Sequence, residues 1–398
     1  MTVRTRTQVA IIGGGPAGLM VSHLLHLAGV DSIVVESRTR KEIETTHRAG
    51  ILERDSVRLL VDSGVSDRVL SHGHEHRGIE LRFGGTSHRI DFAGLVGAST
   101  WLYPQTDVFG DLADARERDG GDIRFGTGKA DVTGVESDVE VRYLDSDGVR
   151  QEVRCDYVVG ADGSRSGCRD LIPHRRQFFR EYPFAWFGIL AQAPPSHPEL
   201  IYASSPRGFA LISQRTATIQ RMYFQCDPDT DVAEWSDSRI WAELQRRVDG
   251  DDGFELRQGP ILERTVLPFR SFVQEPIRHG RLLLAGDAAH TVPPTGAKGL
   301  NLALADARVL AECLVRAVRK DTPDALDEYP SRALHRVWKA QHFSYWMTRL
   351  LHRLPGCDEF DERRQLAELG SVVESVAGST FLAEAYTGWP SSVGGPST

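Results

Sequence analysis

The chain has 398 residues, enough for a large core in two closely joined domains. With 40% hydrophobic and 26% charged residues, its composition excludes a disordered chain, and a net charge of −8 argues against a nucleic-acid-binding surface. No apolar run approaches ~20 residues and the N-terminus has no apolar signal core, so we expect no membrane span and a cytoplasmic location. The 5 cysteines are scattered without metal-ligand spacing, which predicts reduced thiols and no metal site.

The N-terminal segment predicts a β-α-β unit. Residues 9–12 form an apolar run typical of a buried strand, residues 17–28 have helical character, and residues 32–35 form a second strand that ends at Glu36. The sequence Gly-Gly-Gly-Pro-Ala-Gly at 13–18 joins the first strand to the helix. This order of elements indicates a nucleotide-binding turn.

The glycines of this turn have the spacing Gly-x-Gly-x-x-Gly, with Gly13, Gly15 and Gly18 at the three positions. Glycine allows a tight turn and a close approach of the backbone to a pyrophosphate, which then lies at a helix N-terminus. Glu36 follows about 20 residues later, where a carboxylate can accept hydrogen bonds from ribose hydroxyls. The glycine pattern alone would fit a generic turn, but the strand, helix and acid around it favour a dinucleotide.

Two later strands each lead into a Gly/Asp turn. Residues 153–160 precede Asp162-Gly163, and residues 281–285 precede Gly286-Asp287. Each dipeptide alone is an ordinary loop. Together with the first turn they predict three spaced contacts to an extended FAD, with Asp287 facing the ribityl chain. Because only one dinucleotide fingerprint is present, we expect a nicotinamide donor to bind transiently, without a domain of its own.

The remaining pattern predicts an α/β protein. A Rossmann-like FAD-binding domain is interleaved with a β-sheet-rich substrate domain and followed by a C-terminal helical region. Residues 293–301 open a helix over 301–319, whose positive end suits the negative charge of a reduced flavin. The expected domains are 1–177 for FAD binding, 178–272 for the substrate sheet, and 273–398 for completion of the FAD domain and a helical interface region. The other expected elements are strands at 184–190, 209–213 and 218–225, helices at 238–248 and 333–354, and a frayed tail at 391–398.

Four blocks of sequence, at 48–53, 199–203, 207–215 and 286–301, carry a family resemblance. In this order they resemble the class A flavoprotein aromatic hydroxylases, over nearly the whole chain. Within that family the chain is most similar to members that act on 4-hydroxybenzoate. The resemblance implies FAD, NADH or NADPH as reductant, O2, and hydroxylation at position 3 to protocatechuate through a flavin hydroperoxide and the substrate phenolate. It also implies a homodimer, for which the aromatic helix at 333–354 could supply interface as well as core.

The resemblance also implies roles for individual residues. Ser213, Arg215 and Tyr223 correspond to a clamp on the substrate carboxylate, for which the planar guanidinium of arginine is well suited. Tyr202 and Tyr386 correspond to a pair that hydrogen-bonds the substrate phenol. The other implied positions are His76 at the solvent end of a proton path, Pro294 with its carbonyl toward the reacting region, and FAD contacts at Arg48, Gln105, Asp162, Asp287, Leu300 and Asn301.

Each of these side chains also has a simpler interpretation. Arg215 would fit a surface ion pair, the tyrosines would fit packing residues with wet hydroxyls, and Gln105 would fit a loop amide. His76 lies in a histidine-rich run, where a lone histidine is most often on the surface. The occurrence of all of them in one chain favours the catalytic interpretation.

Two departures from the family pattern bear on the nicotinamide donor and the second turn. Ser37 and Thr46 stand where many relatives carry basic residues, and a 2′-phosphate requires basic partners. Glu42 and Glu44 add negative charge nearby, although Arg38, Arg40 and Lys41 offset it. We therefore expect NADH to be used at least as well as NADPH. Residues 164–168 also differ from many relatives, which leaves the contacts of that loop open.

Three rival functions remain to be weighed. The nearest is the same chemistry on another ring, such as 3,4-dihydroxybenzoate, an aminohydroxybenzoate or a specialised-metabolite precursor. A reduced-flavin-dependent halogenase would need a Trp-x-Trp-x-x-Ile segment, which the sequence lacks. A non-catalytic nucleotide-binding sensor would have no need for Tyr202, Ser213, Arg215 and Tyr386 together.

Overall fold

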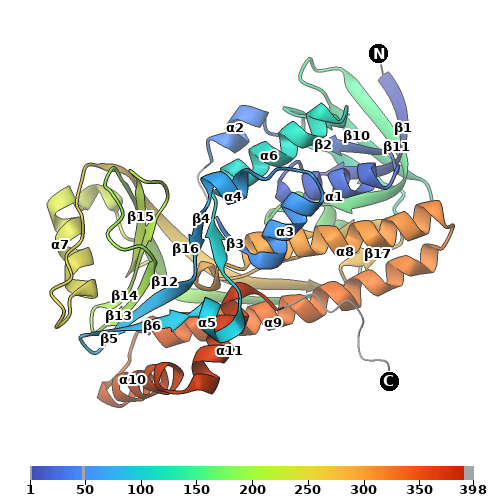
Figure 1. Cartoon of the computed structure of the whole chain (residues 1–398). Coiled ribbons are helices and arrows are strands. Elements are labelled where there is room, and N and C mark those ends of the chain that lie inside the picture. Colours follow the sequence, from blue (N-terminus) through green and yellow to red (C-terminus); the bar gives the residue numbers. More distant parts are fainter. Residues whose placement is uncertain (1, 47–49, 390–398) are drawn as a thin grey trace.

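The computed structural model describes residues 2–46 and 50–389, and the chain forms two halves, each built on a large sheet (Figure 1). A small sheet, in the order β3-β7-β4, lies where the two halves meet. Its strands are β3 (Ile51–Glu53), β7 (Thr100–Leu102) and β4 (His74–His76).

The first large sheet is the Rossmann-like one. Its strand β1 pairs in parallel with both β11 and β2, and β11 pairs in parallel with β18. The apolar run that begins at Val9 is almost completely buried because helices cover a parallel sheet on its faces. Its order is β17 (Arg278–His279), β18 (Leu282–Leu284), β11 (Arg150–Gly160), β1 (Thr2–Ile12), β2 (Ser32–Val35) and β8 (Asp122–Arg124), with β9 (Asp131–Thr133) and β10 (Val139–Leu144) joined to β11 through β10.

Three helices pack together beside this sheet. They are α1 (Pro16–Leu27), α6 (Gln105–Arg118) and α8 (Gly299–Arg319). Helix α1 starts directly after the glycine turn with a proline in its first turn, a position where the missing amide costs nothing. The predicted β-α-β unit is therefore confirmed.

The second large sheet is mostly antiparallel. It includes β12, β14 and β15, the three strands that the sequence predicts here. Helix α7 (Asp237–Val248) covers its outer face and buries Ile240 and Leu244 against the side chains of Phe187 and Phe224. The order is β19 (His290–Thr291), β16 (Ile261–Glu275), β12 (Arg176–Ala191), β15 (Gln220–Cys226), β14 (Gly208–Gln214), β13 (Leu200–Ser205), β5 (Gly78–Phe83) and β6 (Thr86–Asp91).

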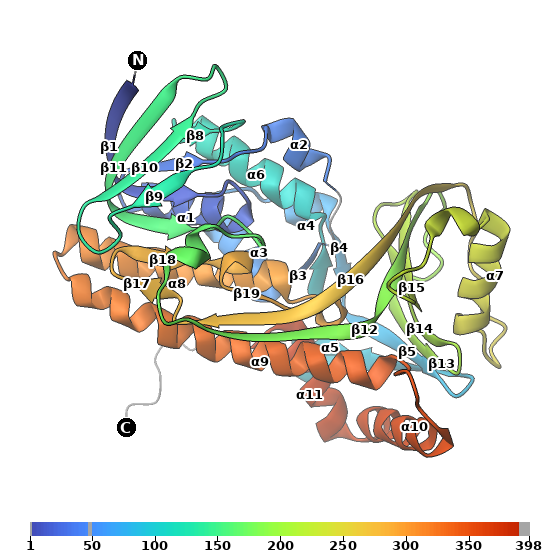
Figure 2. The same cartoon turned by 180° about the vertical axis from the view of Figure 1, so that it is seen from behind.

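Long elements join the two halves. Figure 2 shows β12 and β16 running together from the Rossmann-like half into the second sheet. Helix α9 (Glu328–Leu351) extends along both halves, followed by α10 (Glu359–Glu374) and α11 (Val376–Thr387). On α9, Phe343 is buried whereas Trp338 is 41% exposed, so only part of its aromatic stripe belongs to the core.

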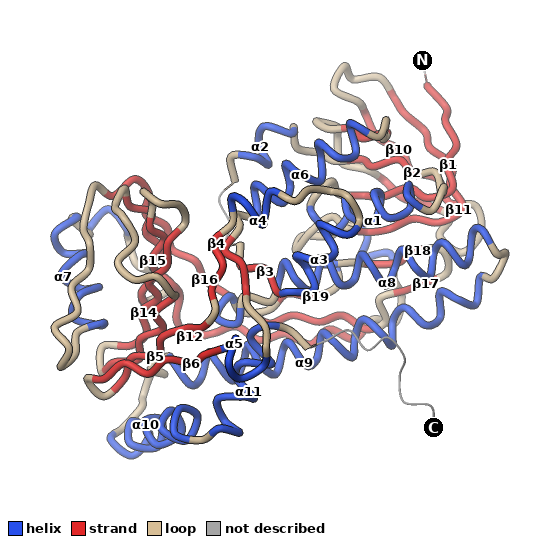
Figure 3. The backbone as a smooth tube through the Cα atoms, in the orientation of Figure 1, coloured by secondary structure: helices blue, strands red, loops and turns tan. Residues whose placement is uncertain are grey.

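Short elements connect the larger ones, as the loops and short helices in Figure 3 show. The helices are α2 (Arg40–Glu44), α3 (Arg54–Asp62), α4 (Arg68–His72) and α5 (Phe92–Val96). The 3-10 turns are η1 (Cys168–Leu171), η2 (Val232–Glu234), η3 (Gly286–Ala288), η4 (Pro294–Gly296) and η5 (Pro323–Asp327).

The structure contains every strand and helix predicted above, with ends shifted by a few residues or strands extended. The second sheet also includes β5 and β6, which precede residue 178 in the chain. The domain boundaries 1–177, 178–272 and 273–398 stay a prediction. The predicted frayed tail at 391–398 lies outside the described residues. Among the residues described, no helix is both long and apolar enough to cross a membrane.

Candidate active site

A cavity of about 1630 Å³ lies between the two halves and brings most of the predicted site residues together. Gly18, His76, Tyr386 and Asn301 are outside its lining, and Arg48 lies outside the described residues. The predicted residues that line it are Gly13, Gly15, Glu36, Gln105, Asp162, Asp287, Leu300, Tyr202, Ser213, Arg215, Tyr223 and Pro294.

The glycine turn fits a pyrophosphate. Gly13 has φ of +109°, and a β-carbon there would lie 2.2 Å from the carbonyl oxygen of Ala161, so a side chain is excluded. Gly15 caps the N-terminus of α1, and a β-carbon on it would meet no heavy atom within 4 Å. The open space beside Gly15 and the unpaired amides of α1 form a cradle for an anion.

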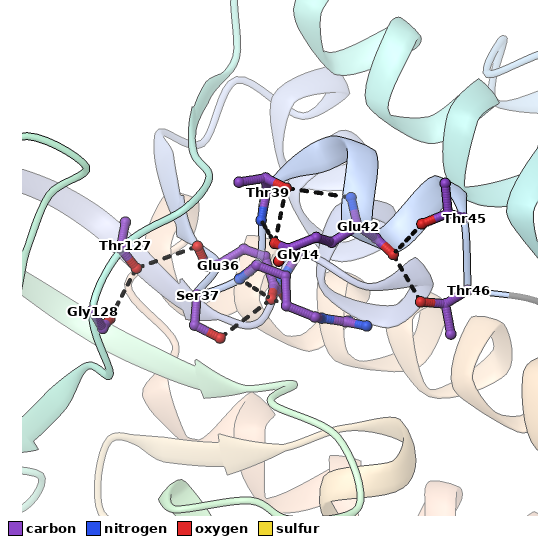
Figure 4. Close-up of polar contacts among 10 residues, drawn as sticks. Gly14, Glu36, Ser37, Thr39, Glu42, Thr45, Thr46, Thr127 and Gly128 are labelled. Atoms are coloured by element: carbon purple, nitrogen blue, oxygen red, sulfur yellow. Dashed lines mark hydrogen bonds and ion pairs between the residues drawn. The ribbon is translucent and has the colours of Figure 1, made fainter.

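Glu36 has a fixed position at the end of β2. One carboxylate oxygen accepts from the amide of Gly14 at 2.8 Å and the other from the amide of Arg38 at 2.9 Å (Figure 4). Its side chain lines the cavity although the residue is only 6% exposed. The carboxylate is therefore held rigidly where the sequence places the ribose.

Polar contacts within the segment after Glu36 hold it in place. Thr39 and Glu42 form a reciprocal capping box at the start of α2, and the hydroxyl of Thr46 donates to the Glu42 carbonyl at 2.8 Å (Figure 4). Arg40 pairs with three carboxylates, those of Glu44, Asp114 and Glu117. Arg40 is thus unavailable to meet a phosphate, whereas Lys41 lies exposed on the same helix.

Asp162 orders the loop that departs from the family pattern. Its carboxylate accepts from the hydroxyl of Ser166 at 2.5 Å and from the amide of Gly167 at 2.8 Å. Arg169, which the sequence analysis missed, then donates to the carbonyls of Ala288 at 2.8 Å and Asp287 at 2.9 Å. The second and third cofactor turns are thus joined through one guanidinium.

The end of the cavity beside β14 and β15 is cationic. Arg215 follows the end of β14, and Tyr223 lies on β15. Burial, and then the charge of Arg221, lower the pKa of Arg215. Arg221 also lines the cavity, and one of its guanidinium nitrogens is buried without a hydrogen-bond partner in the described part of the chain. An anionic group placed here would meet two arginines.

Ser213 differs in detail from its expected role. Its hydroxyl donates to the carbonyl of Arg221 at 2.7 Å, so its proton points along the sheet and away from a ligand. Arg221 was not singled out from the sequence, although its position two residues from Tyr223 places both side chains on one face of a strand.

Tyr202, which lines the cavity, forms a buried pair with Tyr386. Their hydroxyl oxygens lie 2.7 Å apart, and each residue is 1% exposed. The Tyr202 hydroxyl also lies 3.5 Å from the carbonyl oxygen of Thr295, beside Pro294. Burial raises the pKa of both tyrosines well above the usual range, so both stay protonated and can pass a hydrogen bond between neutral hydroxyls.

Lys298 is a third residue that was not singled out from the sequence. It is 1% exposed and lines the cavity at the N-terminus of α8. Its ammonium donates to Glu53 at 2.7 Å and to the Tyr386 carbonyl at 3.0 Å. Burial lowers the pKa of Lys298, and the carboxylate of Glu53 opposes that shift. Its partner Glu53 lies far away in the sequence, so the only sign of Lys298 in the sequence was its position within the 286–301 block.

The side chain of Asn301 bonds to the protein. Its carbonyl oxygen accepts from the amide of Glu53 at 2.8 Å, and its amide group donates to the carbonyls of Ile51 and Ala297, both at 2.9 Å. These bonds tie the first turn of α8 to β3. The structure therefore places the Asn301 side chain behind the cavity wall.

Trp186 lines the cavity, and a hydrogen bond to His352 holds its indole ring in place. Its indole nitrogen donates to Nε2 of His352 at 2.7 Å, and Nδ1 of His352 donates to the carbonyl of Thr348 at 2.9 Å. Burial lowers the pKa of His352 to about 3, so the imidazole is neutral. This neutral form is the one that can accept from the indole.

Comparison with known proteins agrees with this geometry. The FAD binding domain family matches residues 6–344. The chain belongs to this family. A p-hydroxybenzoate hydroxylase from Acinetobacter baylyi is 42% identical over 97% of this chain and 96% of its own length. A 3-(3-hydroxy-phenyl)propionate/3-hydroxycinnamic acid hydroxylase from Mycolicibacterium gilvum is 30% identical over 83% of this chain and 57% of its own length.

Solved structures show the same fold. The crystal structure of p-nitrophenol 4-monooxygenase from Pseudomonas putida has a TM-score of 0.81 at 21% identity, covering 98% of this chain and 100% of that one. At this identity the likeness concerns the fold alone. The predicted α/β flavoprotein fold and the FAD-dependent monooxygenase family are both confirmed.

Proposed function

We propose that this FAD-binding enzyme hydroxylates 4-hydroxybenzoate at position 3 to give protocatechuate, using NADH or NADPH and O2. The observation that supports this most is the lining of one cavity. Arg215, Arg221 and Tyr223 line it together with the aromatic Trp186 and with Tyr202, whose hydroxyl lies 2.7 Å from that of Tyr386. A para-substituted aromatic acid with a carboxylate and a phenol matches that arrangement.

In this proposal the cationic end binds the substrate. Arg215 pairs with the carboxylate, and the hydroxyl of Tyr223 donates a hydrogen bond to it. Ser213 joins them after its hydroxyl rotates away from the Arg221 carbonyl. Binding the carboxylate at this end leaves the phenol directed toward Tyr202.

The tyrosine pair prepares the ring for attack. Bound FAD, cradled by the turns at Gly13, Asp162 and Asp287, supplies the activation of O2. Tyr202 accepts a hydrogen bond from the phenol, and Tyr386 passes the proton on toward His76. Because burial keeps both tyrosines protonated, the charge that develops stays on the substrate as phenolate, which makes the ring carbon beside the phenol electron-rich.

Positive charge near the phenol end stabilises that phenolate. Lys298 lies next to Tyr386, and the N-terminus of α8 lies at the cavity wall. Both act across a water-poor interior, where charges interact more strongly than in solvent. The burial of this end also keeps water from the reacting atoms.

The α2 segment supports NADH as a donor at least as effective as NADPH. Ser37 and Thr46 carry no charge and Arg40 is already paired with carboxylates, which leaves Arg38 and Lys41 as the basic groups that a 2′-phosphate could meet. Kinetics with both donors test this. A kcat/KM for NADPH more than about tenfold above that for NADH, a difference of ~1.4 kcal/mol, would contradict it.

The proposal includes a homodimer in the cytoplasm. The family resemblance supports the dimer, and exposed Trp338 on α9 is one apolar group that a second copy could cover. Light scattering of the purified protein measures the mass directly. A monomer at micromolar concentration would contradict this part of the proposal and leave the chemistry untouched.

A related hydroxy- or aminohydroxybenzoate is the alternative substrate, because it would present the same carboxylate. A panel of hydroxybenzoates, tested with both nicotinamide donors, separates the two. We expect 4-hydroxybenzoate to give the highest ratio of hydroxylated product to reductant consumed. A higher ratio with 3,4-dihydroxybenzoate or an aminohydroxybenzoate would transfer the proposal to that ring.

A further inference from the structure

A cluster of titratable side chains lies where β4 meets the start of β13, outside the cavity lining. Nδ1 of His76 lies 2.9 Å from one carboxylate oxygen of Glu199, and the other oxygen accepts from Arg89 at 3.0 Å. The side chains are 1%, 10% and 44% exposed in the order His76, Glu199 and Arg89. The three residues therefore form a continuous hydrogen-bonded series from the interior to solvent.

This geometry fixes the tautomer of His76. A carboxylate only accepts hydrogen bonds, so Nδ1 carries the proton and Nε2 is left as a bare acceptor. Nε2 is buried without a partner among the described residues. The hydroxyl of Thr100, the register partner of His76 on β7, is also buried without one. A basic nitrogen is thus buried without a partner in the described part of the chain, and a second such polar group lies on the neighbouring strand.

The charges around His76 and Glu199 act in opposite directions. Burial lowers the pKa of His76, and so do the nearby imidazoles of His74 and His197, while Glu199 raises it. Burial alone would raise the pKa of Glu199, but the hydrogen bonds from His76 and Arg89 lower it overall. Near neutral pH the resting cluster is a neutral imidazole beside a carboxylate, which is ready to accept one proton.

Packing connects this cluster to the tyrosine pair. The carbonyl of Arg77, next to His76, accepts from the amide of Ala93 at 3.2 Å. The neighbouring Phe92 stacks on the ring of Tyr386 with 5.1 Å between centroids. Glu199 directly precedes β13, the strand that carries Tyr202. The same two segments therefore support both the tyrosines and the histidine.

We propose that Glu199 is the positioning residue for proton release from the active site, acting through His76 and completed at the surface by Arg89. The inference rests on the proposed hydroxylation of a phenol. The phenol O–H bond breaks, the proton reaches Nε2 of His76 through the tyrosines, and Glu199 balances the imidazolium charge. The imidazolium then gives its Nδ1 proton to Glu199, from which it leaves to water at the Arg89 edge.

A pH-jump experiment on the FAD-loaded protein tests this without turnover. With 4-hydroxybenzoate bound and no reductant present, stopped-flow absorbance records how fast the phenolate appears. We expect Glu199→Gln to slow this step by about tenfold or more while the affinities for FAD and 4-hydroxybenzoate stay unchanged. Glu199→Asp keeps the charge and should recover most of the rate. Glu75→Gln removes an exposed carboxylate from the same strand as His76 and should have no effect.

A Glu199→Gln variant with the wild-type rate would overturn the inference. The proposed function fails separately, if the FAD-loaded wild-type protein does not bind 4-hydroxybenzoate. Should Glu199→Gln not fold, Arg89→Met provides the second test, because it leaves Glu199 in place and removes a cation that lowers its pKa. As the pH is lowered, the rate at which the phenolate appears should therefore begin to fall at a higher pH in Arg89→Met than in the wild-type protein. An unchanged pH profile would contradict the role of Glu199.

Discussion

At the scale of single residues, burial shifts the pKa values of the side chains in this site and so decides which of them carry a charge. Tyr202 and Tyr386 keep their protons because ionisation in the interior is unfavourable, whereas Lys298 is held there by a carboxylate at 2.7 Å. A neutral pair of hydroxyls beside a cation favours an anionic ligand over an anionic side chain. Under the proposed function, this difference lets the tyrosine pair relay a proton and leaves the substrate as the group that ionises.

Replacing Tyr202 with phenylalanine tests that role. The Tyr202→Phe variant should keep its FAD but consume NADH without forming an equal amount of product, because the phenol loses its route to Tyr386. The measurement is the ratio of product to NADH consumed. Tyr345→Phe on α9 is the control and should remain coupled. Full coupling in Tyr202→Phe would remove this residue from the proton path.

Replacing Arg215 tests the carboxylate clamp. One charged hydrogen-bonded pair contributes roughly 1.5–3 kcal/mol, so Arg215→Ala should weaken 4-hydroxybenzoate binding by about tenfold or more. Titration of the flavin spectrum with substrate measures the affinity. Arg246→Ala, an exposed arginine on α7, serves as the control. An unchanged affinity in Arg215→Ala would show that the carboxylate lies elsewhere.

His352 gives a pH dependence of stability with a definite sign. Its pKa is about 3 in the folded protein, lowered by burial from 6.5. Above pH 6.5 both states are neutral and the group has no effect; as pH falls from there toward 3 the unfolded chain takes up a proton first. The free energy of unfolding should decrease by about 1.4 kcal/mol per pH unit in this window. Urea unfolding of His352→Phe should lack this component, and an identical pH slope would contradict the assignment.

Several functional residues could not be predicted from the sequence because their partners are distant in it. Glu53 and Lys298 meet only when β3 and the first turn of α8 are packed, and Arg169 reaches Ala288 only after two strands have paired. The glycine turn and Glu36 were predictable since their signal is local. The hydrogen bond of Ser213 could not be predicted either, because its hydroxyl donates to a carbonyl of the neighbouring strand, that of Arg221.

At the scale of elements, two glycines of the turn between β1 and α1 serve different purposes: Gly13 is required by the fold, whereas Gly15 leaves room for a cofactor. Gly13→Ala would place a methyl group against the carbonyl of Ala161 in a positive-φ backbone, and should lower the free energy of unfolding of the apoprotein by about 1–3 kcal/mol or more. Gly15→Ala meets open space, so it should change apoprotein stability by only about 0.5 kcal/mol. It should nevertheless weaken FAD binding by about tenfold, since the methyl group occupies the anion cradle.

Urea unfolding of the two apoproteins and FAD fluorescence titration provide the measurements. If Gly15→Ala binds FAD with the affinity of the wild-type protein, the cradle does not hold the pyrophosphate. If Gly13→Ala is as stable as the wild-type protein, the close approach to Ala161 is not required for the fold.

Elements with a strong periodic signal were predicted, and those without one were not. The parallel strands β1, β2 and β11 are apolar where both of their faces are covered, at residues 9–12, 33–35 and 158–159. The short strands of the β3-β7-β4 sheet have three residues each and carry polar side chains such as His76, so no alternation marks them. Strand β12 begins earlier than predicted, at Arg176, and its first six residues are exposed, so no pattern of burial marks them in the sequence.

At the scale of the whole molecule, the cavity exists because two sheets share long elements. β12 and β16 pair along their length, and α9 supports both halves, so the FAD turns and the substrate sheet are held at a fixed separation. The sequence predicted both sheets but not this continuity, which depends on strand pairing between residues about 90 positions apart, such as Phe179 and Phe272. The arrangement brings the arginines of the second sheet and Tyr202 into the lining of the cavity that the FAD turns also line.

The most direct test of the account is a reaction of the FAD-loaded protein with 4-hydroxybenzoate, NADH and isotopically labelled O2. Mass spectrometry of the product and absorbance of NADH are followed together. The account predicts protocatechuate that carries one labelled oxygen atom and forms in an amount equal to the NADH consumed. NADH consumption that yields only hydrogen peroxide, or a product without the label, would contradict it.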